Sequence, residues 1–148
     1  MAAEGVTPGT MVLLTRLSRH VYRRSTGTLL GMSLKQFVTL SHLADQDGSP
    51  QHALAEWLGL DANNLVLLLN DLESNGHVVR RRDPADRRRH IVEITPEGRK
   101  ALAVAETAME TVEDDVLAGL DPAERASLAR LLARALEGSD PPGTACRD

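Results

Sequence analysis

Apolar residues recur every three or four positions over most of the chain, which predicts a mainly α-helical protein. The first such stretch, about residues 7–28, has its apolar stripe at Leu13, Leu14, Leu17 and Val21. Later helices are expected at the sequence signals for helix N-termini, which are Ser33 with Gln36 as a capping box, Ser49-Pro50, Asp61, Thr95-Pro96 and Asp121.

The spacing of apolar residues changes from helical to alternating between residues 77 and 95. Segments 77–82 and 90–95 are expected to be the strands of a β-hairpin, joined by the loop 83–89. Val79 on the first strand, and Val92 and Ile94 on the second, are predicted to face the interior. The chain is therefore expected to be mainly α with one small hairpin.

Charge is unevenly distributed along the chain, whose net charge is −4. Residues 80–100 hold eight basic and four acidic side chains, whereas residues 101–148 hold four basic and ten acidic ones. A local basic segment is what phosphate binding requires, and remote acidic surfaces restrain indiscriminate binding. A solvated arginine-rich loop has the same composition, so charge alone leaves both interpretations open.

A short helix, a tight turn at Gly59, a second helix closed by Gly76 and a basic hairpin follow in the order of a winged helix-turn-helix. In that arrangement the second helix can enter the major groove of DNA, and the hairpin can reach the neighbouring minor groove. A helix-turn-helix pattern alone is a weak signal. Its combination with a basic hairpin is much more specific.

Several segments resemble the MarR family of winged helix-turn-helix transcription regulators: Leu34–Leu40, Leu72–Val78, and the run Asp83–Arg88 followed by Val92–Gly98. The resemblance covers about residues 8–137. It implies a homodimer on palindromic double-stranded DNA. Its dimerisation helices would be residues 1–32 and 96–137, and its DNA-binding lobe residues 33–95, with a recognition helix at about 61–75 and a wing at about 77–95. Residues 138–148 are expected to be a disordered tail.

In the family, a wing aspartate and the arginine two positions later form a pair that holds the arginine for insertion into the minor groove. These positions match Asp86 and Arg88. A narrow minor groove attracts a guanidinium, and a pre-oriented side chain loses less entropy on entering it. Arg87 and Arg89 are expected to bind phosphates. The alternatives are an ordinary turn residue at Asp86 and a solvated side chain at Arg88.

The expected recognition helix departs from the common family pattern, because it shows asparagine and apolar side chains where Ser, Thr and Arg are frequent. The predicted DNA contacts are Asn63, Asn64, Leu67 and Asn70. Asparagine can bond adenine N6 and N7 together, and apolar side chains can touch a thymine methyl group. Alternatively, Asn63 and Asn64 are merely suited to a first helical turn, and Leu67 packs against a neighbour.

MarR-like dimers commonly bind small aromatic or phenolic acids between the DNA-binding lobe and the dimer helices. The candidates here are Arg16, Arg19, His20, His42 and Trp57, since an arginine beside aromatic groups can clamp a carboxylate. Each candidate has a structural alternative, such as a core position for Trp57 or an ion pair for Arg16.

Other classes of protein are not expected. The chain has no glycine-rich cofactor domain, its histidines are scattered, and Cys146 is its single cysteine, so neither an enzyme nor a cofactor or metal site is predicted. No apolar stretch reaches the roughly 20 residues of a membrane span. The sequence predicts a cytoplasmic, ligand-responsive DNA-binding repressor. The alternative is a winged-helix interaction module that has lost specific DNA binding.

Overall fold

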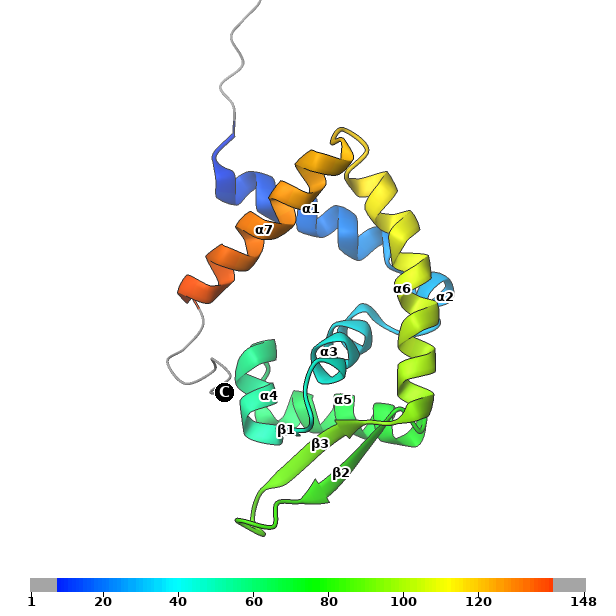
Figure 1. Cartoon of the computed structure of the whole chain (residues 1–148), viewed down its shortest axis with the longest axis vertical. Coiled ribbons are helices and arrows are strands. Elements are labelled where there is room, and N and C mark those ends of the chain that lie inside the picture. The colour runs from blue at the N-terminus through cyan, green and yellow to red at the C-terminus, as the bar shows by residue number, and fades with distance from the viewer. Residues whose placement is uncertain (1–7, 140–148) are drawn as a thin grey trace, which may run out of the picture.

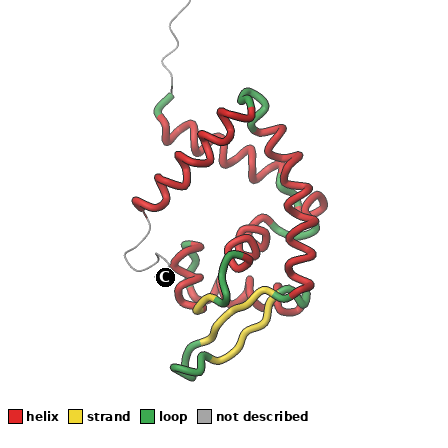
Figure 2. The backbone as a smooth tube through the Cα atoms, in the orientation of Figure 1, coloured by secondary structure: helices red, strands yellow, loops and turns green. Residues whose placement is uncertain are grey.

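The expected mainly helical fold with a small hairpin is confirmed in the computed structural model, which describes residues 8–139. In Figure 1 one long helix links a lower lobe to two helices above it, and Figure 2 shows the hairpin loop projecting from that lobe. The strands form one antiparallel sheet in the order β1-β3-β2. In chain order the elements are α1 (Thr10–Arg24), α2 (Gly27–Leu30), α3 (Leu34–Ala44), β1 (Ser49–Pro50), α4 (Gln51–Leu58), α5 (Ala62–Ser74), β2 (Val78–Arg82), β3 (His90–Ile94), α6 (Pro96–Val116) and α7 (Pro122–Ser139).

Side-chain caps begin several of these helices where the sequence predicts them. The Ser33 and Gln36 side chains each accept a backbone N–H from the other residue, which completes the capping box of α3. Asp61 accepts the Asn64 N–H at the start of α5. Thr95 accepts the Gly98 N–H at the start of α6, and its hydroxyl also donates to the Gly76 carbonyl, which ties the turn before β2 to the start of that helix.

The expected single helix over residues 7–28 is wrong in one respect. α1 ends at Arg24, and a separate short helix, α2, follows it. The break occurs because Thr26 adopts an extended backbone and its side chain accepts the Leu29 N–H, so the chain starts a new helix. The new direction buries Leu30 in the core. Thr7, the expected start, lies outside the described residues.

Ser49 does not cap α4 as the sequence predicts. Ser49 and Pro50 form the short edge strand β1, which pairs with Val92 and Ile91 of β3, and α4 begins at Gln51 without a side-chain cap. Pairing with the sheet gives this backbone its hydrogen bonds, so Ser49 is buried beside the strand instead of free to cap a helix.

The core of the lobe lies where α3, α4, α5 and α6 meet the sheet. Its fully buried side chains are mainly leucines of these helices, with Val78 and Val92 from the hairpin. Val78 and not Val79 faces inward, which corrects the prediction, since Val79 is 46% exposed. The register explains the difference: Val78 lies opposite Ile94, and Arg80 opposite Val92, so these positions share the inner face.

The helices above the lobe remain largely uncovered. None of the residues of α1 or α7 is buried, although both helices carry regular apolar stripes. By contrast, α6 buries Leu102, Ala105 and Val112. Gly138 and Ser139, expected in the tail, are the last residues of α7, and the rest of the predicted tail, including Cys146, lies outside the described residues.

Candidate nucleic-acid interface

Helix α5 packs one face into the core and exposes the other, which carries a stripe of asparagine and apolar side chains. Leu65, Leu69 and Leu72 are buried at helical spacing. Asn63 and Asn70 therefore point outward, and Leu67 between them is 63% exposed, so it is not part of the core of the described residues. The outward stripe is the part of α5 that can enter a groove.

Two of the three asparagines predicted to contact DNA, Asn64 and Asn70, already have hydrogen-bond partners within the chain. The Asn64 backbone N–H and side-chain amide both donate to Asp61, at 2.8 and 3.1 Å, so Asn64 reinforces the first turn of the helix. Asn70 accepts a hydrogen bond of 2.7 Å from the Arg80 guanidinium on β2. Of the expected asparagines, Asn63 has the simplest access to a ligand in front of the helix.

The loop between β2 and β3 brings Asp86 and Arg88 together. The Asp86 carboxylate accepts the backbone N–H of Arg88 at 3.1 Å and its Nε at 3.3 Å, and it lies 3.6 Å from Nε of Arg89. An aspartate that bonds the backbone two residues later is the usual Asx turn. Here the same oxygen also holds a guanidinium, so the turn and the pairing occur together.

Further hydrogen bonds keep this loop in one shape. Arg82 donates to the Arg87 carbonyl at 2.8 Å, and the Asp83 N–H donates to the Arg89 carbonyl at 2.9 Å. The Arg88 side chain itself is 92% exposed. An exposed guanidinium that Asp86 already orients at the tip of a hydrogen-bonded loop is available for an anionic partner at small entropic cost.

Not all arginines of the basic segment are free for an external anion. On the inner face of the hairpin, Arg80 pairs with Glu73 of α5, and on the outer face Arg81 pairs with Glu93 at 2.8 Å. The hydrogen bond from Arg80 lowers the pKa of Glu73, so this carboxylate stays ionised. Available positive charge is thus concentrated at the tip. The inward direction of Arg80 was not predicted, because Val79 was the residue expected to face inward and Arg80 lies in the opposite alternation.

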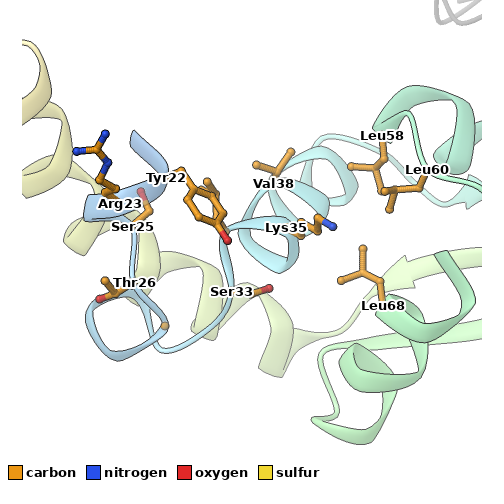
Figure 3. A pocket seen from close by; sticks show the side chains of 12 residues that line it. Tyr22, Arg23, Ser25, Thr26, Ser33, Lys35, Val38, Leu58, Leu60 and Leu68 are labelled. Carbon is orange, nitrogen blue, oxygen red and sulfur yellow. The ribbon is translucent and has the colours of Figure 1, made fainter. Parts of the chain in front are cut away.

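A cavity of about 820 Å³ lies between the end of α1 and the lobe. In Figure 3 the Tyr22 ring lies on one side and Leu58, Leu60 and Leu68 on the other, with Lys35 of α3 between them. Mostly apolar walls with a few polar groups are typical of small-molecule sites. None of these residues was among the ligand candidates predicted from the sequence, although Tyr22 is the only tyrosine of the chain.

The ligand candidates from the sequence lie outside that cavity. Arg16 and His20 line a smaller hollow between α1 and α7, and Arg19 is exposed on α1. His42 and Trp57 stack with ring centroids 3.9 Å apart, which joins α3 to α4. Burial lowers the pKa of His42, and Asp45 opposes this shift. The structure thus brings the five candidates together only in pairs, Arg16 with His20 at one hollow and His42 with Trp57 in one stack.

Two other kinds of site have no support in the described residues. Over residues 8–139, no group of three or more His, Cys, Asp or Glu side chains is arranged to hold a metal ion. In the same range no helix is long and apolar enough to cross a membrane.

Comparison with known proteins agrees with this geometry. A family model described as the MarR family matches residues 30–89. A protein of Thauera aromatica assigned as the transcriptional regulator of the hcr operon is 36% identical over 113 residues, which are 76% of this chain and 68% of that protein.

Two solved structures are similar over most of their length. The transcriptional repressor CouR, solved bound to a 23-mer DNA duplex, is 32% identical with a TM-score of 0.74, covering 86% of this chain and 92% of its own. Bordetella bronchiseptica BpsR, whose DNA binding is regulated by 6-hydroxynicotinic acid, is 27% identical with a TM-score of 0.69 and the same coverage.

Proposed function

Since the chain belongs to the MarR family of transcriptional regulators, we propose that it is a homodimeric cytoplasmic repressor that binds a palindromic DNA operator and is released by a small aromatic acid. The family consists of regulators and not of enzymes. The observation that carries the DNA-binding part is the Asp86–Arg88 pair at the tip of the wing, beside the exposed stripe of α5.

Each part of this interface has a role in the proposal. The wing, which is the β2–β3 hairpin with its loop, places Arg88 in the minor groove and Arg87 and Arg89 on phosphates. The outward stripe of α5 enters the major groove, where Asn63 and Asn70 contact base edges and Leu67 touches a thymine methyl group. CouR was solved on DNA with the same fold, which supports this arrangement.

The uncovered helices support a dimer. α1 and α7 carry apolar side chains that the single chain leaves in solvent, among them Leu13, Leu131 and Leu136, which are 42%, 52% and 61% exposed. Several such residues on adjoining helices form the kind of patch that monomers rarely leave open. A second copy covers this patch in the proposal, and the two lobes then present two wings to the two halves of a palindrome.

The cavity beside Tyr22 is the proposed effector site. Its walls can bury an aromatic ring, and the Lys35 ammonium, with the Tyr22 and Ser33 hydroxyls, can bind a carboxylate. The cavity lies between α1, a proposed dimer helix, and the elements of the lobe. A ligand that binds this cavity more tightly in one position of the lobe than in another favours that position. The distance between the two wings of the dimer then changes with it.

Fluorescence anisotropy with a labelled duplex from the intergenic DNA upstream of the gene tests the proposal. We expect saturable binding, and Arg88→Ala should weaken it by about 1–3 kcal/mol for each wing. Lys100→Ala, which removes the same charge on α6, is the matched control and should change little. Wild-type affinity of Arg88→Ala would refute the proposed wing mechanism, and equal binding to any duplex would indicate a winged-helix module that has lost specific DNA binding.

A further inference from the structure

Arg80 connects the wing to the recognition helix by a defined set of hydrogen bonds. Its position opposite Val92 directs the side chain toward α5, where it is 20% exposed. Its Nε and Nη2 donate to the two oxygens of Glu73, both at 3.2 Å, and Nη2 also donates to Oδ1 of Asn70 at 2.7 Å. Such a forked arrangement holds the guanidinium in one orientation.

This arrangement fixes which end of the Asn70 amide is available to a ligand. An arginine side chain has only donors, so only the carbonyl oxygen of Asn70 can face it, and the NH₂ group must point the other way. Asn70 is exposed on the stripe of α5 that is proposed to enter the major groove. There its NH₂ donors face outward, while its oxygen is turned toward Arg80.

We infer that Asn70 distinguishes bases as a hydrogen-bond donor and selects guanine over adenine at the base it faces, an inference that rests on the proposed function. Bidentate recognition of adenine needs the amide oxygen for N6 and the NH₂ group for N7. Guanine instead presents two acceptors, N7 and O6, to which the NH₂ group can donate. We call the hydrogen bonds of Arg80 to Glu73 and Asn70 the clamp. The clamp thus reverses the preference for adenine that an asparagine would have alone.

The neighbouring arginine provides a matched control. Arg81 also forms an ion pair with a carboxylate, Glu93, but on the outer face of the same strand. Arg80→Met releases the Asn70 oxygen while keeping the length of the aliphatic stem, and Arg81→Met removes the same charge without affecting α5. Any difference between the two variants at the base facing Asn70 reports the clamp and not the net charge of the wing.

The experiment is selection from a random duplex library by the full-length protein and its variants, followed by sequencing of the bound DNA. Asn70→Ala should lose its preference at one position in each half-site, and wild type should have guanine rather than adenine there. Arg80→Met should raise adenine relative to guanine at this position by about tenfold, the value of one good base contact. Arg81→Met should keep the wild-type motif.

Several results would overturn the inference. Adenine at the Asn70-dependent position in wild type, an unchanged motif in Asn70→Ala, or an unchanged motif in Arg80→Met would each do so while leaving the proposed function intact. If wild type enriches no motif, the proposed function fails and the inference with it. If Arg80→Met does not fold, wild type suffices: replacing the selected guanine by 7-deazaguanine should weaken binding severalfold, and unchanged affinity refutes the contact.

Discussion

Replacing Asp86 by alanine removes a negative charge from the wing, yet we expect it to weaken DNA binding. Charge alone predicts the opposite, because the wing tip becomes more positive by one unit on each chain. The structure predicts weakening because Asp86 holds both the backbone and the guanidinium of Arg88 through hydrogen bonds of 3.1 and 3.3 Å. The sign of the change therefore separates the two mechanisms.

The magnitude follows from the competing effects. A freed arginine side chain must be ordered again on binding, at a cost of up to about 2 kcal/mol. Removing a carboxylate at about 7 Å from a phosphate gains about 0.6 kcal/mol in water. The net weakening is about 1 kcal/mol for each wing, and about 2 kcal/mol, or roughly 30-fold, for two wings. Stability should change by less than about 1 kcal/mol, because Arg88 is 92% exposed.

Fluorescence anisotropy on the selected operator measures this difference, with thermal melting to confirm folding. Asp83→Ala is the matched control, because Asp83 lies in the same loop and carries the same charge but bonds only the Ala85 N–H through its side chain. It should bind DNA as well as wild type or slightly better. Equal or tighter binding by Asp86→Ala would refute the positioning role and leave Asp86 as an ordinary turn residue.

Three further predictions concern the rest of the molecule. Gly98→Ala should lower the free energy of unfolding by about 3 kcal/mol or more, because a Cβ there would stand 2.1 Å from the His77 carbonyl oxygen. Thermal melting should show a markedly lower unfolding temperature. Leu136→Asp, at an exposed apolar position of α7, should shift sedimentation toward monomer while circular dichroism stays unchanged, and an intact dimer would exclude this face from the interface. Burial lowers the pKa of His42, so the unfolded chain takes up its proton more readily and stability falls as pH drops below about 6.5. The stability of His42→Gln, followed by the fluorescence of Trp57 during unfolding, should therefore depend less on pH between about 7 and 5.5. The same pH dependence as in wild type would contradict this.

Local signals in the sequence were sufficient for most helix starts and for the wing. The side chains of Ser33, Asp61 and Thr95 act within their own turns, so neighbouring residues determine their roles. The pairing of Asp86 with Arg88, which the family resemblance implied, is local in the same sense, because both belong to one loop. Such features depend little on the rest of the fold.

Features that depend on distant segments were mispredicted or missed. The inward direction of Val78 is set by its register with β3, and the run Val78-Val79 offers no internal choice between the two faces. Ser49 looks like a helix cap, but pairing with Val92 makes it part of a strand. The cavity beside Tyr22 is lined by helices from different parts of the chain, so no single stretch of sequence indicates it.

Hydroxyl-radical footprinting on the selected operator tests most directly the claim that two wings of a dimer enter the minor groove through Arg88. For wild type we predict two protected minor-groove segments placed symmetrically outside two major-groove contacts. In Arg88→Ala these outer segments should become accessible to the radical while the centre of the site stays protected. Identical footprints for the two proteins, or protection on one side only, would contradict the account.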